Sequence, residues 1–204
     1  MKTLKVLIAT ALLSASGLAH SNLIVNGGFE DHTITSGWTY GPDASGGWEG
    51  DNLEIWATGF LNVVSYEGMR HAELNAHPHH QDVWSIYQSF DTVVGQLYEV
   101  SFAYRARRND SEKFRFEIID GTSLIDEVMH EHHTNDWSVF NDTFIGTGNP
   151  TKLKFTSIYP YAGTVGNFID DVSVTSVPAP SVLALMCGGI VGFGLSRIRA
   201  RTRS

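Results

Sequence analysis

Hydrophobic and polar residues alternate with a period of two in several short runs of this chain. Three runs show the alternation most clearly, and their apolar positions are Tyr98, Val100, Phe102 and Tyr104, then Phe114, Phe116 and Ile118, then Leu153 and Phe155. Successive side chains of a strand point to opposite faces, so this pattern predicts strands that bury one face.

Further β-rich runs lie between these three. They cover residues 23–25, 53–56, 62–66, 71–74, 85–90, 124–129, 137–144 and 168–174. Gly, Asn, Asp or Pro separates many of them, and no convincing amphipathic helix occurs between residues 22 and 176. Many short strands joined by glycine-rich loops predict an all-β fold, a two-sheet antiparallel sandwich of the jelly-roll type.

The N-terminal segment has the composition of a secretory signal peptide. Lys2 and Lys5 precede an apolar run at residues 6–13, and small residues fill positions 14–21. An N-terminal membrane anchor is the alternative, but the apolar run is well short of the roughly 20 residues that span a bilayer. We therefore expect export, with residues 1–21 removed after Ala19 or Ser21.

The C-terminal segment, residues 177–204, divides into three parts. Prolines at 178 and 180 interrupt regular structure in residues 177–181, a glycine-rich apolar stretch follows at 182–195, and arginines dominate residues 196–204. This order predicts a single hydrophobic helix, just long enough for a thin or tilted span, with its basic end held on the cytoplasmic side.

One domain is expected between the two ends, at residues 22–176. Six of the 14 basic residues lie in the terminal segments, which leaves eight basic against 22 acidic residues and a net charge of −14. Nucleic acids and anionic membrane surfaces are poor partners for such a domain, because both require a basic face. The single cysteine, Cys187, lies in the tail, so stability must come from a packed core.

Histidines gather in two loop-like segments with the same His-x-His-His pattern. They are His77, His79 and His80, and His130, His132 and His133. Imidazoles at this density can bind zinc, copper or nickel, and the two segments can share one ion if they meet at one end of the sandwich. A surface whose charge changes with pH is the alternative.

Aromatic and arginine side chains are the candidates for binding sugars. The large aromatics considered are Trp38, Trp48, Trp56, Trp84, Trp137, Tyr159 and Tyr161. We assign Trp38 and Trp137 to the core and expect Trp84, Tyr159 and Tyr161 to be exposed platforms for sugar rings. Arg107 is a candidate clamp for acidic sugars, with a solvated loop or an ion pair as the alternative.

No catalytic motif emerges. The chain contains no Gly-x-Ser-x-Gly, no His-Glu-x-x-His and no phosphate-binding loop. Pairs of carboxylates such as Glu49 with Glu54, or Glu73 with Asp82, suit glycoside hydrolysis only at a spacing in space that sequence does not give. We therefore expect a protein that is not an enzyme.

The tail resembles the PEP-CTERM sorting signal of Gram-negative bacteria. Val177, Pro178, Ala179 and Pro180 occupy the positions of its Val-Pro-Glu-Pro-like motif, with Ala179 where glutamate is usual, and an apolar helix and an arginine-rich end follow. The resemblance implies transient anchoring in the inner membrane and recognition by an exosortase-like sorting enzyme. The destination would be the cell surface or the extracellular polysaccharide matrix. A permanent single-span anchor is the alternative.

The middle domain resembles carbohydrate-binding modules of the galactose-binding-like jelly-roll superfamily. The resemblance rests on residues 22–30, Gly37-Trp38 and residues 167–174. It implies a structural calcium ion held by Glu30 and Asp170; the alternative is that both acids are solvated or paired with arginine. Independently, Asp170 alternates with apolar residues of the last run, and a buried carboxylate requires a cation or hydrogen-bond donors.

Three functions follow as hypotheses. The first is an exported, non-catalytic protein of the surface or matrix that binds extracellular polysaccharide. The second is a small polysaccharide lyase or glycosidase. The third is a transition-metal binder built on the two histidine segments.

Overall fold

The structure is a computed structural model that describes residues 21–41, 46–78, 83–129 and 133–178. The signal segment, apart from Ser21, and the expected C-terminal helix lie outside these residues. Among the described residues, no helix is long and apolar enough to cross a membrane.

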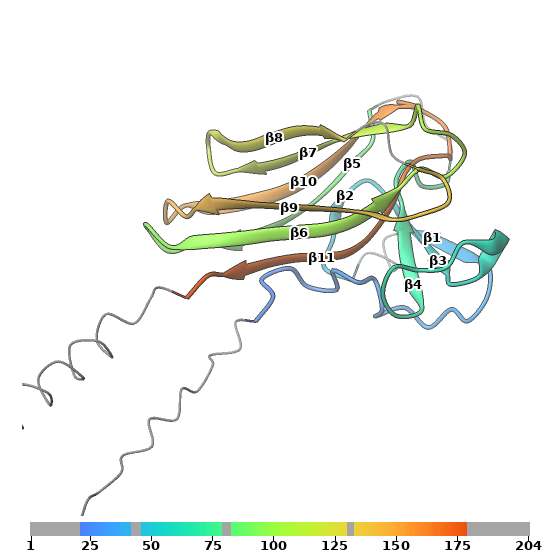
Figure 1. Ribbon diagram of the computed structural model, residues 1–204, viewed down its shortest axis with the longest axis horizontal. Coiled ribbons are helices and arrows are strands. Elements are labelled where there is room, and N and C mark those ends of the chain that lie inside the picture. The colour runs from blue at the N-terminus through green and yellow to red at the C-terminus, as the bar shows by residue number, and fades with distance from the viewer. Residues whose placement is uncertain (1–20, 42–45, 79–82, 130–132, 179–204) are drawn as a thin grey trace, which may run out of the picture.

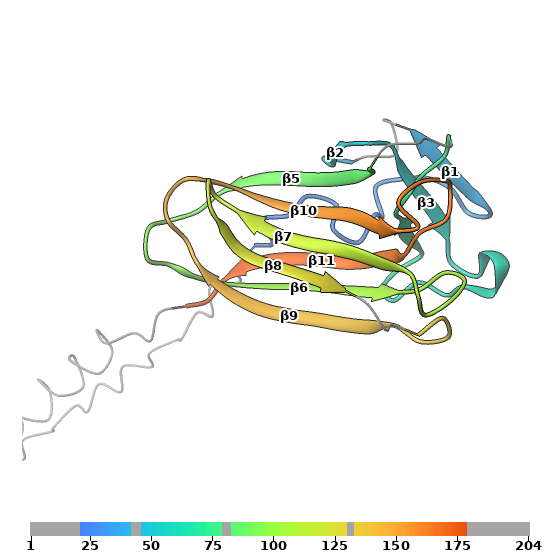
Figure 2. The ribbon, with the colours of Figure 1, turned by 90° about the horizontal axis from the view of Figure 1, so that it is seen from above.

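Two antiparallel sheets form a sandwich (Figures 1 and 2). The first sheet has the order β1 (Trp38–Gly41), β3 (Leu53–Ala57), β4 (Arg70–Glu73), β11 (Phe168–Ser176), β6 (Leu97–Arg105) and β9 (Ser138–Ile145). The second has the order β2 (Glu49–Gly50), β5 (Ser85–Asp91), β10 (Pro150–Tyr159), β7 (Lys113–Ile119) and β8 (Ser123–Met129). The predicted all-β, two-sheet antiparallel sandwich is confirmed.

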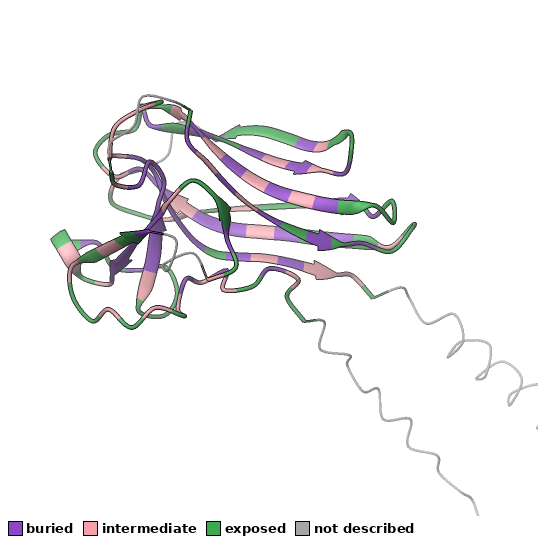
Figure 3. Cartoon of the chain, turned by 180° about the vertical axis from the view of Figure 1, so that it is seen from behind, coloured by how far each residue is buried: buried purple, intermediate pink, exposed green. Residues whose placement is uncertain are grey.

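The main core lies between the sheets and is built from the alternating positions of the sequence. Phe102 of β6 packs against Phe116 of β7 and Phe155 of β10, with ring centroids 4.8 and 5.1 Å away. Figure 3 shows the result as alternating buried and more exposed bands along the strands of the sandwich. The period-two pattern therefore identified the inward faces of β6, β7 and β10 correctly.

A second apolar cluster covers the outer face of the six-stranded sheet. Trp56, Val63 and Phe168 are buried there, and Phe60 of the short 3₁₀ helix η2 (Phe60–Asn62) packs on them. The strand expected at residues 62–66 is wrong, because positive φ angles at Leu61 and Asn62 turn the backbone out of an extended path. The loop that follows β3 lies over the sheet instead of extending it.

The first described segment runs beside β11 without forming a strand. Leu23 N–H donates to the Val174 carbonyl at 2.8 Å, and Val172 N–H donates to the Gly27 carbonyl at 3.0 Å. The expected strand at residues 23–25 is therefore replaced by a bent segment that still hydrogen-bonds to the last strand. This contact brings the two ends of the domain together.

Candidate functional site

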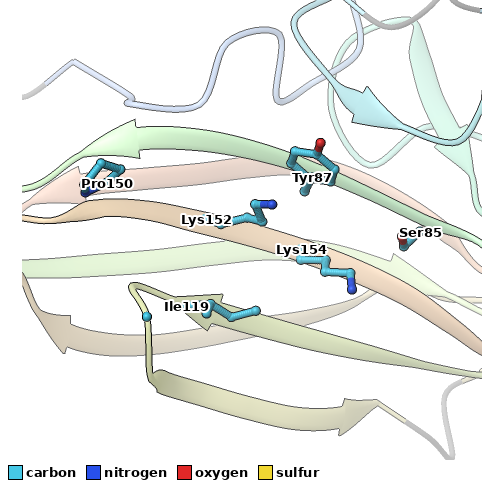
Figure 4. A pocket seen from close by; sticks show the side chains of 7 residues that line it. Ser85, Tyr87, Ile119, Pro150, Lys152 and Lys154 are labelled. Atoms are coloured by element: carbon cyan, nitrogen blue, oxygen red, sulfur yellow. The ribbon is translucent and has the colours of Figure 1, made fainter.

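The outer face of the five-stranded sheet carries two adjoining pockets, which together we name the sheet groove. The first has a volume of about 350 Å³ and is lined by Ser85 and Tyr87 of β5, by Lys152 and Lys154 of β10 and by Ile119, among others. Figure 4 shows Tyr87, Lys152, Lys154 and Ile119 side by side on three strands. Hydroxyl and ammonium groups therefore lie beside a lining whose surface is mostly apolar.

The second pocket shares Lys154 with the first and continues along β10. Its volume is about 470 Å³, and its lining includes Arg115 and Glu117 of β7, Thr156 of β10 and Tyr161. The sheet groove thus crosses β5, β10 and β7 at the centre of the sheet.

Strand register explains why these side chains share one face. Lys154 lies opposite Tyr87 on β5 and opposite Glu117 on β7, while Thr156 lies opposite Arg115. Residues directly opposite each other point to the same side of a sheet. The apolar neighbours on β10 point inward, so the same alternation that builds the core also builds the polar floor of the groove.

Two interactions order the charged side chains in the groove. The Lys152 ammonium lies 3.8 Å from the centroid of the Tyr87 ring, a cation–π contact. Arg115 Nε lies 3.6 Å from Asp126 Oδ1, and both side chains are almost half exposed. Such an exposed, long ion pair contributes little, so the guanidinium can exchange partners.

Tyr161, Tyr159 and Trp84 were expected to be exposed platforms. Tyr161 lines the sheet groove and is 59% exposed, and Tyr159 at the end of β10 is 53% exposed. Trp84 is 0% exposed, so its assignment as an exposed platform is wrong. Its carbonyl accepts a hydrogen bond from Ser157 N–H, which continues the pairing of β5 with β10 and places the indole in the core.

Other tryptophans also differ from the expectation. Trp38, assigned to the core, is 42% exposed, because β1 is the edge strand of its sheet. Trp137 is partly buried against the second apolar cluster.

A smaller pocket, the end pocket, lies at the β1 side of the six-stranded sheet. Trp38, Glu54, Trp56, His77 and Arg107 contribute to its walls, and its volume is about 130 Å³. The His77 ring meets the exposed Tyr40 ring edge-on at 4.6 Å. The end pocket therefore has aromatic walls but is much smaller than the sheet groove.

Arg107 is held in the end pocket by an ion pair. Its Nη1 donates to Glu73 Oε1 at 2.6 Å, and its guanidinium carbon lies 4.7 Å from the centroid of the Trp56 ring. Arg107 was a candidate clamp for acidic sugars, and this pair with the fully buried Glu73 fits the alternative that we considered.

Buried ionisable groups surround this pair. Burial raises the pKa of Glu73 well above its usual value, although the charge of Arg107 opposes the shift. Burial, together with the charge of Arg105, lowers the pKa of His71 to about 3. Glu54 accepts hydrogen bonds from Trp56 Nε1 at 2.8 Å and from His77 N–H at 3.1 Å. These groups are built into the fold, with Glu73 and His71 out of reach of solvent.

Glu30 and Asp170, the pair expected to hold calcium, both accept hydrogen bonds from the backbone of one loop, residues 66–70. Glu30 accepts N–H donors from Met69 and Arg70 and forms an ion pair with Arg70 at 2.8 Å. Asp170 accepts N–H donors from Tyr66 and Glu67 at 2.9 and 3.0 Å.

Asp170 is fully buried, and burial raises its pKa to about 7. A backbone break at Asp171, with φ of 49°, turns Asp170 outward with Phe168, while Val172 points into the main core.

A cation would offset the cost of burying the Asp170 carboxylate. In the described part of the chain, no group of three or more His, Cys, Asp or Glu side chains is arranged to hold a metal. The donor set fits calcium only if backbone carbonyls and water complete it.

The histidine segments are described in part. His79, His80, His130 and His132 lie outside the described residues; His77 lines the end pocket and His133 is exposed. Ser85 at the start of β5 and Val128 near the end of β8 lie in one row across β10 and β7. The start of β5 and the end of β8 therefore lie at the same end of the sheet, three strand spacings or about 14 Å apart.

Two residues of the sorting motif are described. Val177 N–H donates to the Leu97 carbonyl at 2.8 Å, so the domain ends against β6. Pro178 is the last described residue, and Ala179 and Pro180 lie outside.

Comparisons with known proteins concern the fold. No family model and no curated protein matches the chain. Among solved structures, TmCBM61 in complex with β-1,4-galactotriose matches with 16% identity and a TM-score of 0.49, over 77% of this chain and 99% of that one. The CBM22-1 xylan-binding domain of Paenibacillus barcinonensis Xyn10C matches with 17% identity and a TM-score of 0.49, over 79% and 98%.

A third solved structure matches with a higher TM-score. It is the arabinose-bound MgGH51 α-L-arabinofuranosidase, with 12% identity and a TM-score of 0.53, over 77% of this chain and 26% of that one. At this identity the likeness is one of fold alone. The domain shares the jelly-roll sandwich, and its function must be argued from its own surface.

Proposed function

We propose that this protein is an exported, non-catalytic glycan-binding protein of the cell surface or extracellular matrix. The signal segment directs export in this proposal. The tail anchors the chain in the inner membrane until an exosortase-like enzyme processes it. The sandwich then binds extracellular polysaccharide through the sheet groove.

The size and position of the sheet groove carry the proposal. Its two pockets, of about 350 and 470 Å³, fall in the range of ligand sites, whereas the end pocket of about 130 Å³ falls below it. The groove also crosses three strands, so it can accept an extended chain. Hydroxyl, amine and carboxylate groups line it beside an exposed tyrosine, which is the combination that sugars require.

Two tyrosines of one short segment provide the test. Tyr161 lines the sheet groove, whereas Tyr159 is similarly exposed but is not among the residues that line it. In polysaccharide pull-down and calorimetry, Tyr161→Ala should weaken binding about three- to tenfold, because a stacked ring contributes about 0.5 to 1.5 kcal/mol. Tyr159→Ala should leave binding unchanged.

Trp38→Ala tests whether polysaccharide binds in the end pocket instead of the sheet groove. If it abolishes binding while Tyr161→Ala has no effect, the end pocket is the site and the groove proposal is wrong. No binding to any polysaccharide of the producing cell's own matrix would overturn the function itself.

The same samples decide between binding and catalysis. We expect no new reducing ends and no unsaturated products after long incubation with the polysaccharides that bind. Release of either product would make the protein a glycosidase or a lyase.

Calcium belongs to the proposal as a structural ion held by Glu30 and Asp170. The buried Asp170 carboxylate, which has no ion-pair partner among the described residues, supports it. Calcium should raise the melting temperature relative to EDTA, and Asp170→Asn should remove the difference. Equal melting temperatures of the unmodified protein in calcium and EDTA would contradict a calcium site.

The histidine segments are the basis of a second hypothesis, in which the protein binds a transition metal. Metal analysis of untagged protein, repeated with His79→Ala and His132→Ala, tests it. A stoichiometric transition metal that both variants lose would favour one site shared by the two segments.

A further inference from the structure

We infer that the sheet groove selects polysaccharides that carry carboxylate groups. This inference rests on the proposed function and specifies its ligand class. It follows from the charges in the groove, their spacing and the contact that Lys152 makes with the Tyr87 ring.

The groove is basic on a domain that is strongly acidic. Between the two terminal segments the chain has eight basic and 22 acidic residues. Lys152, Lys154 and Arg115 line the groove, and Glu117 is the one acidic residue among its lining. Three of the eight basic residues of the domain therefore line the groove, but only one of its 22 acidic residues does. The excess of negative charge on the rest of the domain repels an anionic chain, so the basic groove is the surface where such a chain can bind.

The three cations form a regular row. Lys152 and Lys154 are two residues apart on β10 and point to the same face, which spaces them by about 7 Å. Arg115 lies diagonal to Lys154, because Lys154 is opposite Glu117 and Thr156 is opposite Arg115. Diagonal neighbours in a sheet are about 7 to 8 Å apart. Regular spacing suits a polymer whose charged groups repeat along the chain.

In the described part of the chain, neither lysine of the groove forms an ion pair, and Arg115 forms only a long one. The three ion pairs found there involve Arg70, Arg107 and Arg115, so neither lysine of the groove belongs to one. The pair of Arg115 with Asp126 is 3.6 Å long and almost half exposed. A ligand carboxylate can replace Asp126 with little loss.

The Tyr87 ring is arranged for charge recognition and not for stacking. The Lys152 ammonium already occupies one face of the ring at 3.8 Å. A neutral sugar would have to displace this ammonium before stacking there, whereas an acidic sugar can pair with the ammonium in place. The floor of the groove therefore favours an acidic sugar over a neutral one.

The test compares polygalacturonate with neutral β-1,4-galactan on the full-length chain and on charge variants. The unmodified protein should bind polygalacturonate at least tenfold more tightly, and binding should weaken as salt rises from about 50 to 300 mM because screening increases. The double variant Lys152→Gln with Lys154→Gln should lose about tenfold or more on polygalacturonate. Its affinity for galactan should not fall.

The double variant Arg108→Gln with Lys113→Gln is the matched control. Arg108 and Lys113 are exposed cations that are not among the groove lining, so their loss removes the same two positive charges without changing the lining. This control should retain binding to polygalacturonate within about twofold. An equal loss in both variants would mean that net charge, not the groove, governs binding.

The remaining outcomes separate the two proposals. Equal affinity for both polymers, unaffected by the lysine changes, would overturn the ligand class and leave glycan binding in place. Binding to neither polymer nor to any other polysaccharide would overturn both.

Discussion

Trp84 and Tyr161 are both large aromatics next to polar segments, yet they have opposite surroundings. Trp84 is 0% exposed in the main core, and Tyr161 is 59% exposed on the groove. Truncating a buried tryptophan removes its transfer free energy and leaves a cavity, whereas truncating an exposed ring does neither. The difference can be measured as stability.

Trp84→Ala should lower the free energy of unfolding by about 3 to 5 kcal/mol. Tyr161→Ala should change it by no more than about 0.5 kcal/mol. Urea denaturation of both variants measures this, and a similar small effect for both would mean that Trp84 is exposed after all.

His71 gives the stability a defined pH dependence. Its pKa is lowered from 6.5 to about 3 in the folded protein, so between these values the unfolded chain binds a proton that the folded chain does not. The contribution of His71 is therefore full above pH 6.5 and is lost as the pH falls toward 3. The slope can reach about 1.4 kcal/mol per pH unit.

Comparison with His71→Gln isolates this effect from the opposite one of Glu73, whose pKa is raised. The stability advantage of the unmodified protein over the variant should shrink as the pH is lowered from 7 to 4. An advantage that stays constant over this range would show that His71 binds its proton as readily in the folded as in the unfolded protein, which contradicts a lowered pKa.

At the scale of elements, the strands with a clear alternation were predictable and the covering loops were not. The inward faces of β6, β7 and β10 follow directly from the period of two. Asp170 was expected to lie with the core side chains of its strand, and it is buried, but the break at Asp171 places it on the outer face. A single positive φ angle inside a strand has no signal in the hydrophobic pattern.

The two adjacent glycines at the start of the domain have different roles in this structure. A Cβ on Gly27 would lie 1.9 Å from the Val172 carbonyl oxygen, so the first segment can approach β11 only without a side chain. A Cβ on Gly28 would meet the end of the Glu67 side chain at 2.9 Å, and that carboxylate can rotate away.

Gly27→Ala should therefore lower the free energy of unfolding by about 1 to 3 kcal/mol, through overpacking. Gly28→Ala should have an effect within about 0.5 kcal/mol. Chemical denaturation distinguishes them, and equal effects would contradict the close packing of the first segment on the last strand.

At the scale of the whole molecule, the acidic net charge was visible in the sequence but the basic groove was not. Lys152, Lys154 and Arg115 occupy the polar positions of β10 and β7, which sequence analysis identified only as outward-facing. These three side chains meet because β10 lies between β5 and β7, and this strand order is not predicted by the sequence pattern. Tyr161 was predicted as an exposed aromatic residue from its turn-like surroundings. Tyr87 and the two lysines were not predicted as site residues, because their position in the groove depends on this strand order.

In the proposed function, polysaccharide binds across the outer face of the five-stranded sheet. Amide chemical shifts, recorded while an oligosaccharide of the most tightly bound polysaccharide is added, test it most directly. The largest changes should occur at the groove residues of β5, β10 and β7, and all of them should saturate with a single dissociation constant. Changes confined to Trp38, His77 and their neighbours at the end pocket, with none on the sheet face, would contradict it.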